Sequence, residues 1–346
     1  MLLERKRCEM KPVCNSVSVC VPATSANLGS GFDVAGIALD YADSLVFTLD
    51  DTLDDSQDVR VIIHGEGEST LPKDETHLVV RAFRKACEAF DLPHLRFTLE
   101  AHNRIPQARG MGSSASAIVS GVAAAWAFAH NGNLNKQAIF ELAAAIEGHP
   151  DNVAPAVFGG LTTSWKNGDE FHTVRYGVSK QIRATIFVPN FTLSTQMARK
   201  ALPEKVPYAD AVFNVSRACL LPIAFGDFGD SRDSANSCAK TTLSRNDLLF
   251  TATQDAIHQP YRASLMQPTW DLVKALRNKG FAAAISGAGS CAAVFYEEKS
   301  PATVDENNAT NISEKIEKIA EPLLSGCDWR ILHVNVDSIG VAITRE

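Results

Sequence analysis

The stretch RGMGSSAS, residues 109–116, places flexible glycines and serine hydroxyls directly before an alanine-rich apolar run. The N-terminus of a helix exposes unpaired backbone N–H groups and the positive end of the helix dipole. Gly110 and Gly112 would let the main chain curl so that these N–H groups converge on one anion, and Ser113 and Ser114 would add hydroxyls. The loop therefore predicts a phosphate-binding site.

The loop matches neither of two common nucleotide-binding motifs. A Walker A loop has the pattern G-x-x-x-x-G-K-[ST], and no lysine follows these glycines. The serines after Gly112 do not complete a G-x-G-x-x-G fingerprint either. An alternative is that the loop only caps a helix, with Ser113 or Ser114 as the N-cap residue.

Three further stretches combine glycine with polar residues in predicted loops. They are PATSANLGSGFD (22–33), EGHPDNVAPAVFGG (147–160) and SGAGS (286–290). A packed core has no use for such stretches. Four of them in one chain favour a shared ligand site over helix capping alone.

The composition limits the classes of partner. With 346 residues, 45% of them hydrophobic and 21% charged, the chain is long enough for two packed globular domains. A net charge of -7 argues against a general affinity for nucleic acid, which needs clustered Lys and Arg. No run of about 18 apolar residues and no signal peptide is found, so we expect a cytoplasmic protein without a membrane partner. Eight cysteines without a CxxC pair predict reduced, mostly buried thiols.

The spacing of apolar residues predicts the elements that must position these loops. Strands are expected at 17–21, 45–50, 59–65, 95–103 and 182–190, and helices at 78–90, 114–130 and 135–148. Residues 22–33 are expected to form a loop, and the C-terminal part ends in a strand, helix, strand series. The pattern restarts after the tryptophan at 165, which predicts domains 1–172 and 173–346, with an exchange of terminal strands left open.

Together the motifs resemble the GHMP small-molecule kinase superfamily and, within it, the homoserine kinase family. IPQARGMGSSASA is similar to the phosphate loop P-x-x-x-G-L-G-S-S-A, and VPATSANLGSGFDVAGIAL resembles the first motif in its homoserine kinase form. ISGAGSCAAVF resembles the third motif, and EGHPDNVAPAVFGG is the most family-specific stretch. STQMARKALPEKVPYADAVFN and DAIHQPYRASLMQP have the spacing of homoserine kinases, so the resemblance covers most of the chain.

The sequence departs from the family pattern at five positions. Ser30 and Ser290 stand where the family usually has proline, Met111 replaces leucine, and Ala108 replaces glycine. His77 stands where an asparagine often approaches the adenine. None of these changes removes a charged or metal-binding group.

The resemblance implies an α/β (α+β) fold of two domains with the active site between them. The N-terminal domain would be similar to ribosomal protein S5 domain 2, and the C-terminal domain would be ferredoxin-like. The implied reaction transfers a phosphoryl group from ATP to the hydroxyl of L-homoserine, with Mg²⁺, on the route to threonine. A homodimer is also an expectation, because dimers are common in the family.

The resemblance also implies which residues bind ATP and metal. Phosphoryl transfer needs alignment and charge neutralisation more than covalent chemistry. Mg²⁺, which prefers oxygen ligands, is expected on the Ser114 hydroxyl and Glu141, both counted as catalytic. The alternative for Glu141 is an exposed helix carboxylate. The expected ATP contacts are Pro106, Arg109, Gly110, Met111, Gly112, Ser113, Ser114 and Ala115.

The implied acceptor carries a carboxylate, an ammonium and a hydroxyl. Arg199 and Arg262 fall where the family's carboxylate-binding arginines do, with Thr195 nearby, and a guanidinium matches a carboxylate as a planar fork. Asn27 and Asp33 resemble the groups that orient the hydroxyl and amino ends, and both are counted as catalytic. Their alternatives are a left-handed turn residue and a loop cap.

The turn EGHPDN adds further candidates. Asn152 is expected to contact the substrate. His149 is also a candidate contact, although a lone histidine is more often structural. Asp151 would either hold the turn together or touch the substrate.

Two other functions remain as alternatives. Another GHMP kinase would act on mevalonate, a sugar or a diphosphocytidyl polyol, which lack an α-carboxylate beside an ammonium. A catalytically silent binding protein would predict damage to the glycine loop, which is intact. No residue stands out as an obligatory general base, with Asp33 the minority candidate, since deprotonation can come late in a loose transition state.

Overall fold

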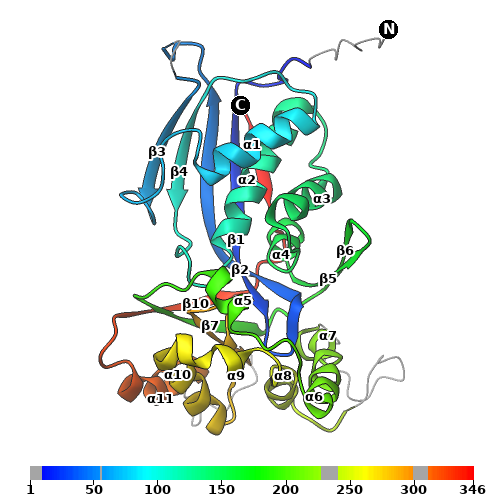
Figure 1. The fold of residues 1–346 in the computed structure, drawn as a ribbon, viewed down its shortest axis with the longest axis vertical. Coiled ribbons are helices and arrows are strands. Elements are labelled where there is room, and N and C mark those ends of the chain that lie inside the picture. Colours follow the sequence, from blue (N-terminus) through cyan, green and yellow to red (C-terminus); the bar gives the residue numbers. More distant parts are fainter. Residues whose placement is uncertain (1–9, 55–56, 227–240, 299–310) are drawn as a thin grey trace.

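The structure is a computed structural model that describes residues 10–54, 57–226, 241–298 and 311–346. Two β-sheets organise the chain (Figure 1). The larger sheet has the strand order β11-β1-β2-β4-β3, with β5 pairing to β2 and β6 to β5. The smaller sheet has the order β10-β7-β9-β8.

The larger sheet is antiparallel except for one pair. Its strands are β1 (Ser16–Asn27), β2 (Gly31–Leu49), β3 (Val59–Gly65), β4 (Phe97–Asn103), β5 (Leu161–Asn167), β6 (Glu170–Tyr176) and β11 (Ala342–Arg345). β3 and β4 are parallel, and α1 (Leu78–Ala89) supplies the crossover that a parallel pair requires. Alternate residues of β3 are buried, so this strand has one face toward the core and one toward solvent.

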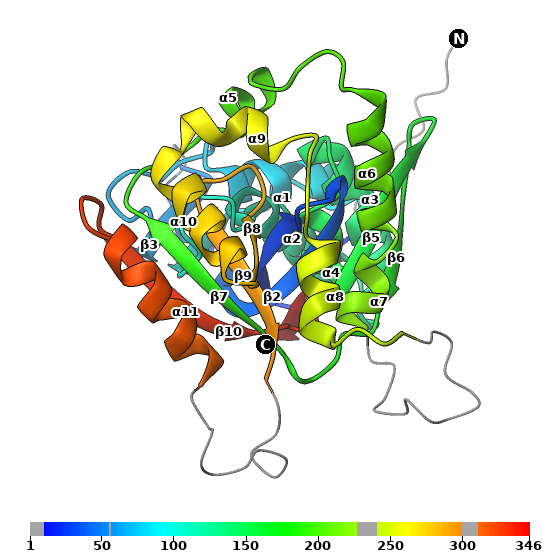
Figure 2. The ribbon, with the colours of Figure 1, turned by 90° about the horizontal axis from the view of Figure 1, so that it is seen from below.

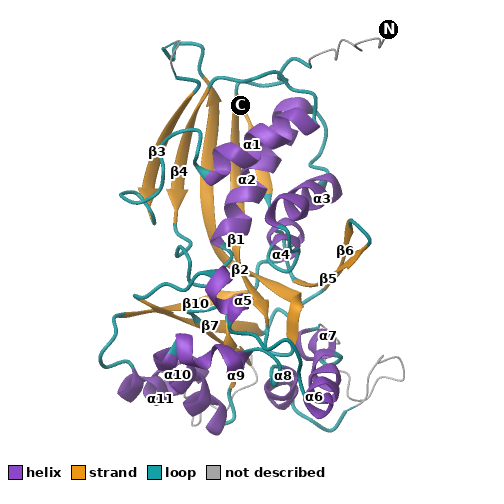
Figure 3. Cartoon of the chain, in the orientation of Figure 1, coloured by secondary structure: helices purple, strands orange, loops and turns teal. Residues whose placement is uncertain are grey.

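Four helices cover the core face of this sheet (Figure 3). They are α1, α2 (Ser113–Ala129), α3 (Lys136–Glu147) and α4 (Val153–Phe158). A group of phenylalanines from the sheet and helices fills the layer between them: Phe47, Phe83, Phe97 and Phe128. Full burial of such a side chain stabilises the fold by about 1.5–3 kcal/mol.

The smaller sheet consists of β7 (Ile182–Pro189), β8 (Ala282–Ile285), β9 (Ala292–Glu297) and β10 (Trp329–Asn335). Its helices lie on the side that faces away from the larger sheet (Figure 2). The packed helices are α8 (Arg245–Ala252), α10 (Gln267–Asn278) and α11 (Ile312–Ala320). Shorter elements complete this part: α5 (Thr195–Lys200), α6 (Tyr208–Ala218), α7 (Leu221–Phe225), α9 (Gln259–Arg262), η1 (Ala263–Leu265) and η4 (Glu321–Leu323).

The chain crosses between the sheets twice. It leaves the larger sheet after β6 and enters the smaller one at β7, and it returns at its end, where β11 pairs antiparallel with β1. An exchange of terminal strands, left open from the sequence, is therefore present. A shared core cluster that includes Ile37, Leu221 and Phe295 connects the two parts.

Most sequence-predicted elements agree with the structure to within a few residues, but the prediction of a loop at 22–33 is wrong. β1 continues to Asn27 and β2 begins at Gly31, which leaves a turn of only three residues. The polar residues that suggested a loop, Thr24 and Ser25, are fully or almost fully buried in the strand. Their hydroxyls form hydrogen bonds with Asn152 and Ser286 of neighbouring loops, which explains why a buried strand contains polar residues.

The prediction of mostly buried thiols is also wrong for the described chain. Of the six described cysteines, all free, Cys87 and Cys291 are buried, whereas Cys20 and Cys219 are exposed. Within the described ranges no helix is long and apolar enough to cross a membrane.

Candidate active site

All four loops meet at one cavity of about 390 Å³. Its wall includes Asn27 and Asp33 of the β1–β2 region, the start of α2, and the turn between α3 and α4. Thr195 and Arg199 of α5, Arg262 of α9, and the β8–β9 loop complete the wall. Segments far apart in the chain therefore contribute to one site, from both sheets.

The start of α2 has unsatisfied backbone donors that face this cavity. The N-cap is Gly112, in a left-handed conformation (φ 73°) and without a side-chain cap. The first intrahelical bond is donated by the Ser116 N–H to the Gly112 carbonyl, so the preceding N–H groups have no helical partner. The alternative that Ser113 or Ser114 caps the helix is therefore wrong.

Close packing explains the two glycines of this loop. A Cβ on Gly112 would lie 1.9 Å from Thr24 Oγ1, and a Cβ on Gly110 would lie 2.1 Å from the Ser286 carbonyl oxygen. Both residues have positive φ, at 73° and 82°. Only glycine combines this backbone conformation with such a close approach.

The third motif packs against the phosphate loop. The Ser286 hydroxyl lies 2.6 Å from the Gly110 carbonyl and 2.9 Å from Ser25 Oγ. The Gly287 N–H donates to the Ala26 carbonyl at 3.0 Å. The β8–β9 loop thus joins the phosphate loop to the end of β1.

Five of the predicted ATP contacts line the cavity: Gly110, Gly112, Ser113, Ser114 and Ala115. The other three, Pro106, Arg109 and Met111, do not line it. The Arg109 guanidinium donates to the carbonyls of Pro189 (2.8 Å) and Asn190 (3.0 Å). These hydrogen bonds anchor the phosphate loop to the end of β7. Met111 is fully buried in the core.

The structure places a glutamate other than the predicted Glu141 beside Ser114. Ser114 Oγ donates to Oε2 of Glu147 at 2.8 Å, and both residues line the cavity. Glu141 is exposed, and its carboxylate instead accepts a hydrogen bond from Gln137 at 2.8 Å. Six residues of helix separate the two glutamates by about 9 Å along the axis and turn them to different faces.

Glu147 has the properties of a metal carboxylate. Burial raises its pKa, opposed by the hydrogen bond from Ser114. Burial disfavours the charged form of a carboxylate, and a nearby positive charge stabilises that form. The pair offers two hard oxygen atoms, which is the ligand type that Mg²⁺ prefers.

Asn27 and Asp33 form a rigid unit near Arg199. Both residues have positive φ, at 71° and 57°. Asn27 Oδ1 accepts from the Asp33 N–H at 2.9 Å, and Asn27 Nδ2 donates to the Gly287 carbonyl at 2.6 Å. The Asp33 carboxylate accepts two hydrogen bonds from the Arg199 guanidinium, at 2.9 and 3.1 Å. Asn27, Asp33 and Arg199 therefore lie together in one cavity wall.

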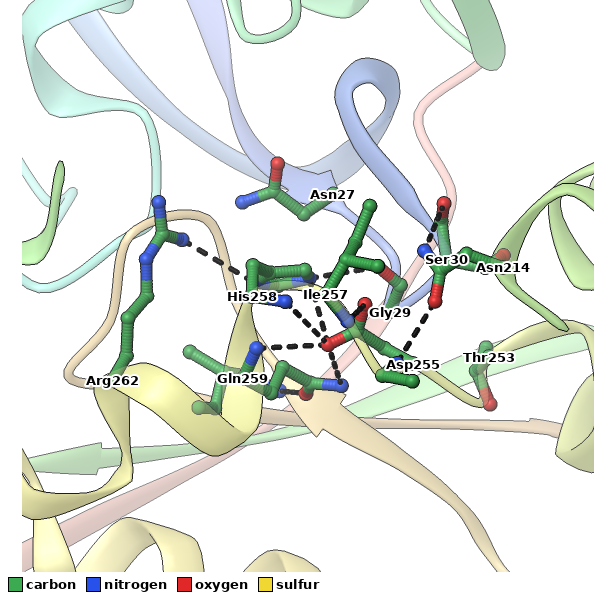
Figure 4. Close-up of polar contacts among 12 residues, drawn as sticks. Asn27, Gly29, Ser30, Asn214, Thr253, Asp255, Ile257, His258, Gln259 and Arg262 are labelled. Atoms are coloured by element: carbon green, nitrogen blue, oxygen red, sulfur yellow. Dashed lines mark hydrogen bonds and ion pairs between the residues drawn. The ribbon is translucent and has the colours of Figure 1, made fainter. Parts of the chain in front are cut away.

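Arg262 is almost entirely buried, with 2% of its surface exposed, yet it lines the cavity. Its Nε donates to the Ala198 carbonyl at 3.2 Å, and its Nη1 lies 3.3 Å from His258 Nδ1 (Figure 4). The guanidinium also lies over the Phe32 ring, 5.1 Å from its centroid. Among the described residues, no carboxylate accepts a hydrogen bond from this guanidinium. An anionic ligand in the cavity would supply such a carboxylate.

His258 holds Arg262 and is itself fixed by two neighbours. Its Nε2 lies 2.8 Å from the Gly29 carbonyl, an acceptor only, so Nε2 carries the proton and Nδ1 accepts from Arg262 (Figure 4). Burial lowers the His258 pKa, which fits this neutral tautomer. The Asp255 carboxylate organises the same turn by accepting from the N–H groups of Ile257, His258 and Gln259.

Sequence analysis did not identify this supporting group. The stretch DAIHQPYR contains it, but Gly29 is 229 residues away, so its partner is not visible from local spacing. Glu147 was likewise missed, although it begins the quoted turn EGHPDN.

The α3–α4 turn presents His149, Asp151 and Asn152 to the cavity, as expected. His149 Nδ1 lies 3.2 Å from Asp151 Oδ1, and this hydrogen bond raises the His149 pKa against the opposing effect of burial. Asn152 accepts from Thr24 Oγ1 at 2.7 Å and donates its N–H to Asp151 at 2.9 Å. Asp151 therefore holds the turn together, and it also faces the cavity.

Part of the cavity wall is apolar. It consists of Leu45, Leu71, Leu78 and Val79. His77 also lies there, 4% exposed, and its Nδ1 has no hydrogen-bond partner within the described protein. Burial lowers the His77 pKa, so the ring is neutral near pH 7. An unpaired buried nitrogen is costly, which points to a hydrogen bond with a ligand.

Asp43 also lines the cavity and was not identified from the sequence. Its carboxylate accepts from the N–H groups of Arg104 (2.7 Å) and Ile105 (2.9 Å). Burial outweighs these bonds and raises the pKa of Asp43 to about 6. A single aspartate within a strand gives no motif by which it could have been found.

The family models and the similar proteins of known name all belong to the GHMP kinases. Residues 77–160 match the GHMP kinases N terminal domain, and residues 238–315 match GHMP kinases C terminal. The chain is 44% identical to a homoserine kinase of Clavibacter michiganensis, over 79% of this chain and 80% of that protein. It is 39% identical to a homoserine kinase of Corynebacterium kroppenstedtii, over 90% of this chain and 94% of the relative.

Solved structures share the fold. The crystal structure of a homoserine kinase from Cytophaga hutchinsonii superimposes with a TM-score of 0.76 at 24% identity, covering 96% of this chain and 98% of that one. The L. major mevalonate kinase in complex with R-mevalonate superimposes with a TM-score of 0.63 at 13% identity, covering 95% and 99%. At these identities the likeness concerns the fold alone.

Proposed function

The chain belongs to the homoserine kinase family of the GHMP kinases, and from this premise we propose that it phosphorylates the side-chain hydroxyl of L-homoserine. The phosphoryl donor is ATP, and the products are O-phospho-L-homoserine and ADP. The observation that carries the proposal is that one cavity joins the uncapped start of α2 to Arg262 and the Asp33–Arg199 ion pair. The reaction is a step of threonine biosynthesis, and a cytoplasmic location is part of the proposal.

ATP would lie with its base at the apolar part of the cavity wall and its phosphates at the start of α2. The aliphatic walls suit the faces of a purine, and the unpaired Nδ1 of neutral His77 accepts a hydrogen bond from an amino group. The backbone N–H groups at the start of α2 donate to phosphate oxygens and, with the helix dipole, favour negative charge. The loop needs no lysine for this task.

Mg²⁺ fits the oxygen pair of Ser114 and Glu147. When bound with ATP it would neutralise part of the phosphate charge as the phosphoryl group transfers. Glu147 supplies a carboxylate from α3, and Ser114 supplies a hydroxyl from the helix that also holds the phosphates. Charge neutralisation therefore sits beside the phosphate loop, which compensates for the absence of a lysine.

Homoserine would enter between Asp33, Arg199 and Arg262. Its carboxylate takes a guanidinium fork and its ammonium takes the Asp33 carboxylate, so the substrate replaces the internal ion pair by two charge-matched contacts. Asn27 and Asn152 stand close enough to the phosphate loop to direct the hydroxyl toward it: a Cβ on Gly112 would lie 3.2 Å from Asn152 Oδ1. Alignment of hydroxyl and phosphoryl group is the main contribution of the protein.

No dedicated general base is part of this proposal. With homoserine bound, the Asp33 carboxylate would face the substrate ammonium rather than the reacting hydroxyl. In a loose transition state the hydroxyl proton leaves late, so phosphate oxygens or solvent suffice as acceptors.

A second candidate is phosphorylation of a neutral or carboxylate-only alcohol such as mevalonate, whose kinase shares the fold. Such substrates carry no ammonium for Asp33, and two arginines with one aspartate match the charges of an amino acid better. This candidate is kept as an outcome of the test.

The test is ADP release from the purified protein with Mg²⁺ and ATP. L-homoserine is compared with mevalonate, galactose, L-serine and no acceptor, and the product is identified by ³¹P NMR. We expect release with L-homoserine far above the other acceptors. Release with mevalonate instead would support the second candidate, and equal release under all conditions would contradict both.

A further inference from the structure

Two histidines and a glutamate outside the cavity lie together on the solvent face of the larger sheet. They are His64 of β3 and Glu100 and His102 of β4, and their ligand atoms all lie within 4.8 Å of one another. Among the residues that the structure describes, no other group of three His, Cys, Asp or Glu side chains is so close. We propose that these three residues bind a divalent transition metal, with Zn²⁺ as the representative ion.

The strand register fixes the arrangement. β3 and β4 are parallel, and His64 is the direct partner of His102. Glu100 precedes His102 by two residues, so both side chains leave β4 on the same face. Ala101, which lies between the two β4 ligands, and its register partner Ile63 on β3 are buried on the core face. All three candidate ligands therefore leave the backbone on one face of two adjacent strands.

The distances agree with a metal centre. Glu100 Oε1 lies 3.4 Å from His64 Nε2 and 3.2 Å from His102 Nε2. Tetrahedral Zn²⁺ with bonds of about 2.0–2.1 Å separates neighbouring ligand atoms by about 3.3 Å. The two imidazole rings are stacked, with centroids 4.7 Å apart and planes at 21°, so their Nε2 atoms flank one carboxylate oxygen from the same side of the sheet.

Surface ion pairing alone explains this convergence poorly. The three side chains are about half exposed, at 48%, 45% and 53%. Exposed pairs of this kind contribute about 0–1 kcal/mol, which barely offsets the ordering of three side chains. In register, Glu100 is flanked by Val46 and Ile62, so its neighbours on the adjacent strands are apolar. A shared ion would give each of the three side chains a strong partner.

The ligand set defines the class of ion. Two imidazoles and one carboxylate suit Zn²⁺, Cu²⁺ or Ni²⁺, whereas Mg²⁺ prefers oxygen ligands throughout. The fourth position would be open to solvent, to a ligand or to a side chain of another molecule. This site is thus chemically distinct from the Ser114–Glu147 pair and independent of the proposed kinase activity.

The test is isothermal titration of the full chain with Zn²⁺ in buffer that contains excess Mg²⁺ and no nucleotide. The wild type should bind one Zn²⁺ per chain. H64A and H102A should each bind Zn²⁺ with an affinity more than about tenfold lower. E100Q should weaken binding as well. Titration with Co²⁺ gives a second readout, because coordination by imidazole produces visible absorption bands that the same variants should lose.

H172A is the matched control. His172 is also a partly exposed sheet histidine beside a glutamate, Glu170 at 3.7 Å, but it belongs to no group of three ligands in the described chain. H172A should bind Zn²⁺ like the wild type, and far-ultraviolet circular dichroism without metal should be the same for all variants. Unchanged Zn²⁺ affinity in H64A and H102A, or no stoichiometric binding by the wild type, would overturn the proposal.

Discussion

Asp33 and Arg199 form a two-point ion pair, Oδ2 to Nη1 at 2.9 Å and Oδ1 to Nη2 at 3.1 Å, that links the β1–β2 region to α5. Each charge is thereby satisfied by the other. A zwitterionic ligand can replace both contacts at once, whereas a ligand with only one charge would leave a partner unpaired. Under the proposed function, this ion pair would select for an amino acid.

Replacement of Arg199 by alanine tests this selection. We expect R199A to raise the KM for L-homoserine by about 10- to 100-fold, because a hydrogen bond to a charged group contributes about 1.5–3 kcal/mol. The KM for ATP should change little. R183A is the control, since Arg183 pairs with Glu298 outside the cavity. A similar rise in both KM values for R199A would contradict the assigned role.

Glu147 and Glu141 form a natural pair of variants on one helix. E147Q should lower kcat by about 100-fold or more, since it removes the charge beside the phosphate loop, and should raise the Mg²⁺ concentration needed for half-maximal rate. E141Q should keep a kcat near that of the wild type because its side chain is exposed. Steady-state rates across a Mg²⁺ series measure both effects. The reverse ranking would restore Glu141 as the metal carboxylate.

Gly112 and Gly148 separate steric from conformational effects. Both have positive φ, at 73° and 88°, where an alanine costs about 1–2 kcal/mol. A Cβ at Gly148 meets nothing within 4 Å, whereas one at Gly112 collides with Thr24. G148A should therefore lose only that stability and stay active, and G112A should also lose ATP binding. Urea unfolding and calorimetric titration with ATP compare them, and equal ATP affinities would argue against this phosphate site.

Asp43 should make stability depend on pH in a defined direction. Its pKa is about 6 in the folded chain against 3.8 for the free group, so between these values only the folded state holds the proton. The free energy of unfolding therefore decreases as pH rises from about 4 to 6, by about 3 kcal/mol, and the loss is complete above the folded pKa. D43N lacks this carboxyl. The stability difference between wild type and D43N should change over this range in urea unfolding, and parallel pH curves would refute the expectation.

His77 should contribute to nucleotide affinity without affecting the acceptor. H77A removes a ring nitrogen that is buried without a hydrogen-bond partner in the described protein. If a bound nucleotide supplies that partner, ADP affinity should fall about three- to tenfold. H94A, at an exposed histidine, serves as the control. Calorimetric titration with ADP measures the effect. Unchanged ADP affinity together with a raised homoserine KM would show that His77 does not contact the adenine base of the nucleotide.

The sequence was sufficient where residue type alone determines the role. Gly110 and Gly112 are required by positive φ and close packing. Arg199 and Arg262 line the cavity. These residues occur in quoted motifs, so resemblance located them without three-dimensional information.

The positions of Glu141 and Glu147 on α3 show what resemblance alone could not determine. Phe140, Ala143 and Ala144 are buried, and their spacing places Glu147 on the inward side of α3 and Glu141 on the outward side. The spacing of these buried residues therefore indicates, from the sequence alone, which glutamate faces inward. The group that holds Arg262 was not readable, since it depends on a contact between His258 and Gly29 across 229 residues.

The return of β11 to the larger sheet has a consequence for how the protein is made. Synthesis proceeds from the N-terminus, so β1 emerges from the ribosome before every other described strand, whereas its partner β11 emerges after all of them. Until then the outer edge of β1 lacks its neighbour, and an unpaired edge is a template for association with other chains. The nascent larger sheet is therefore incomplete until β11 has been synthesised, and a chain cut before Ala342 would keep that edge permanently.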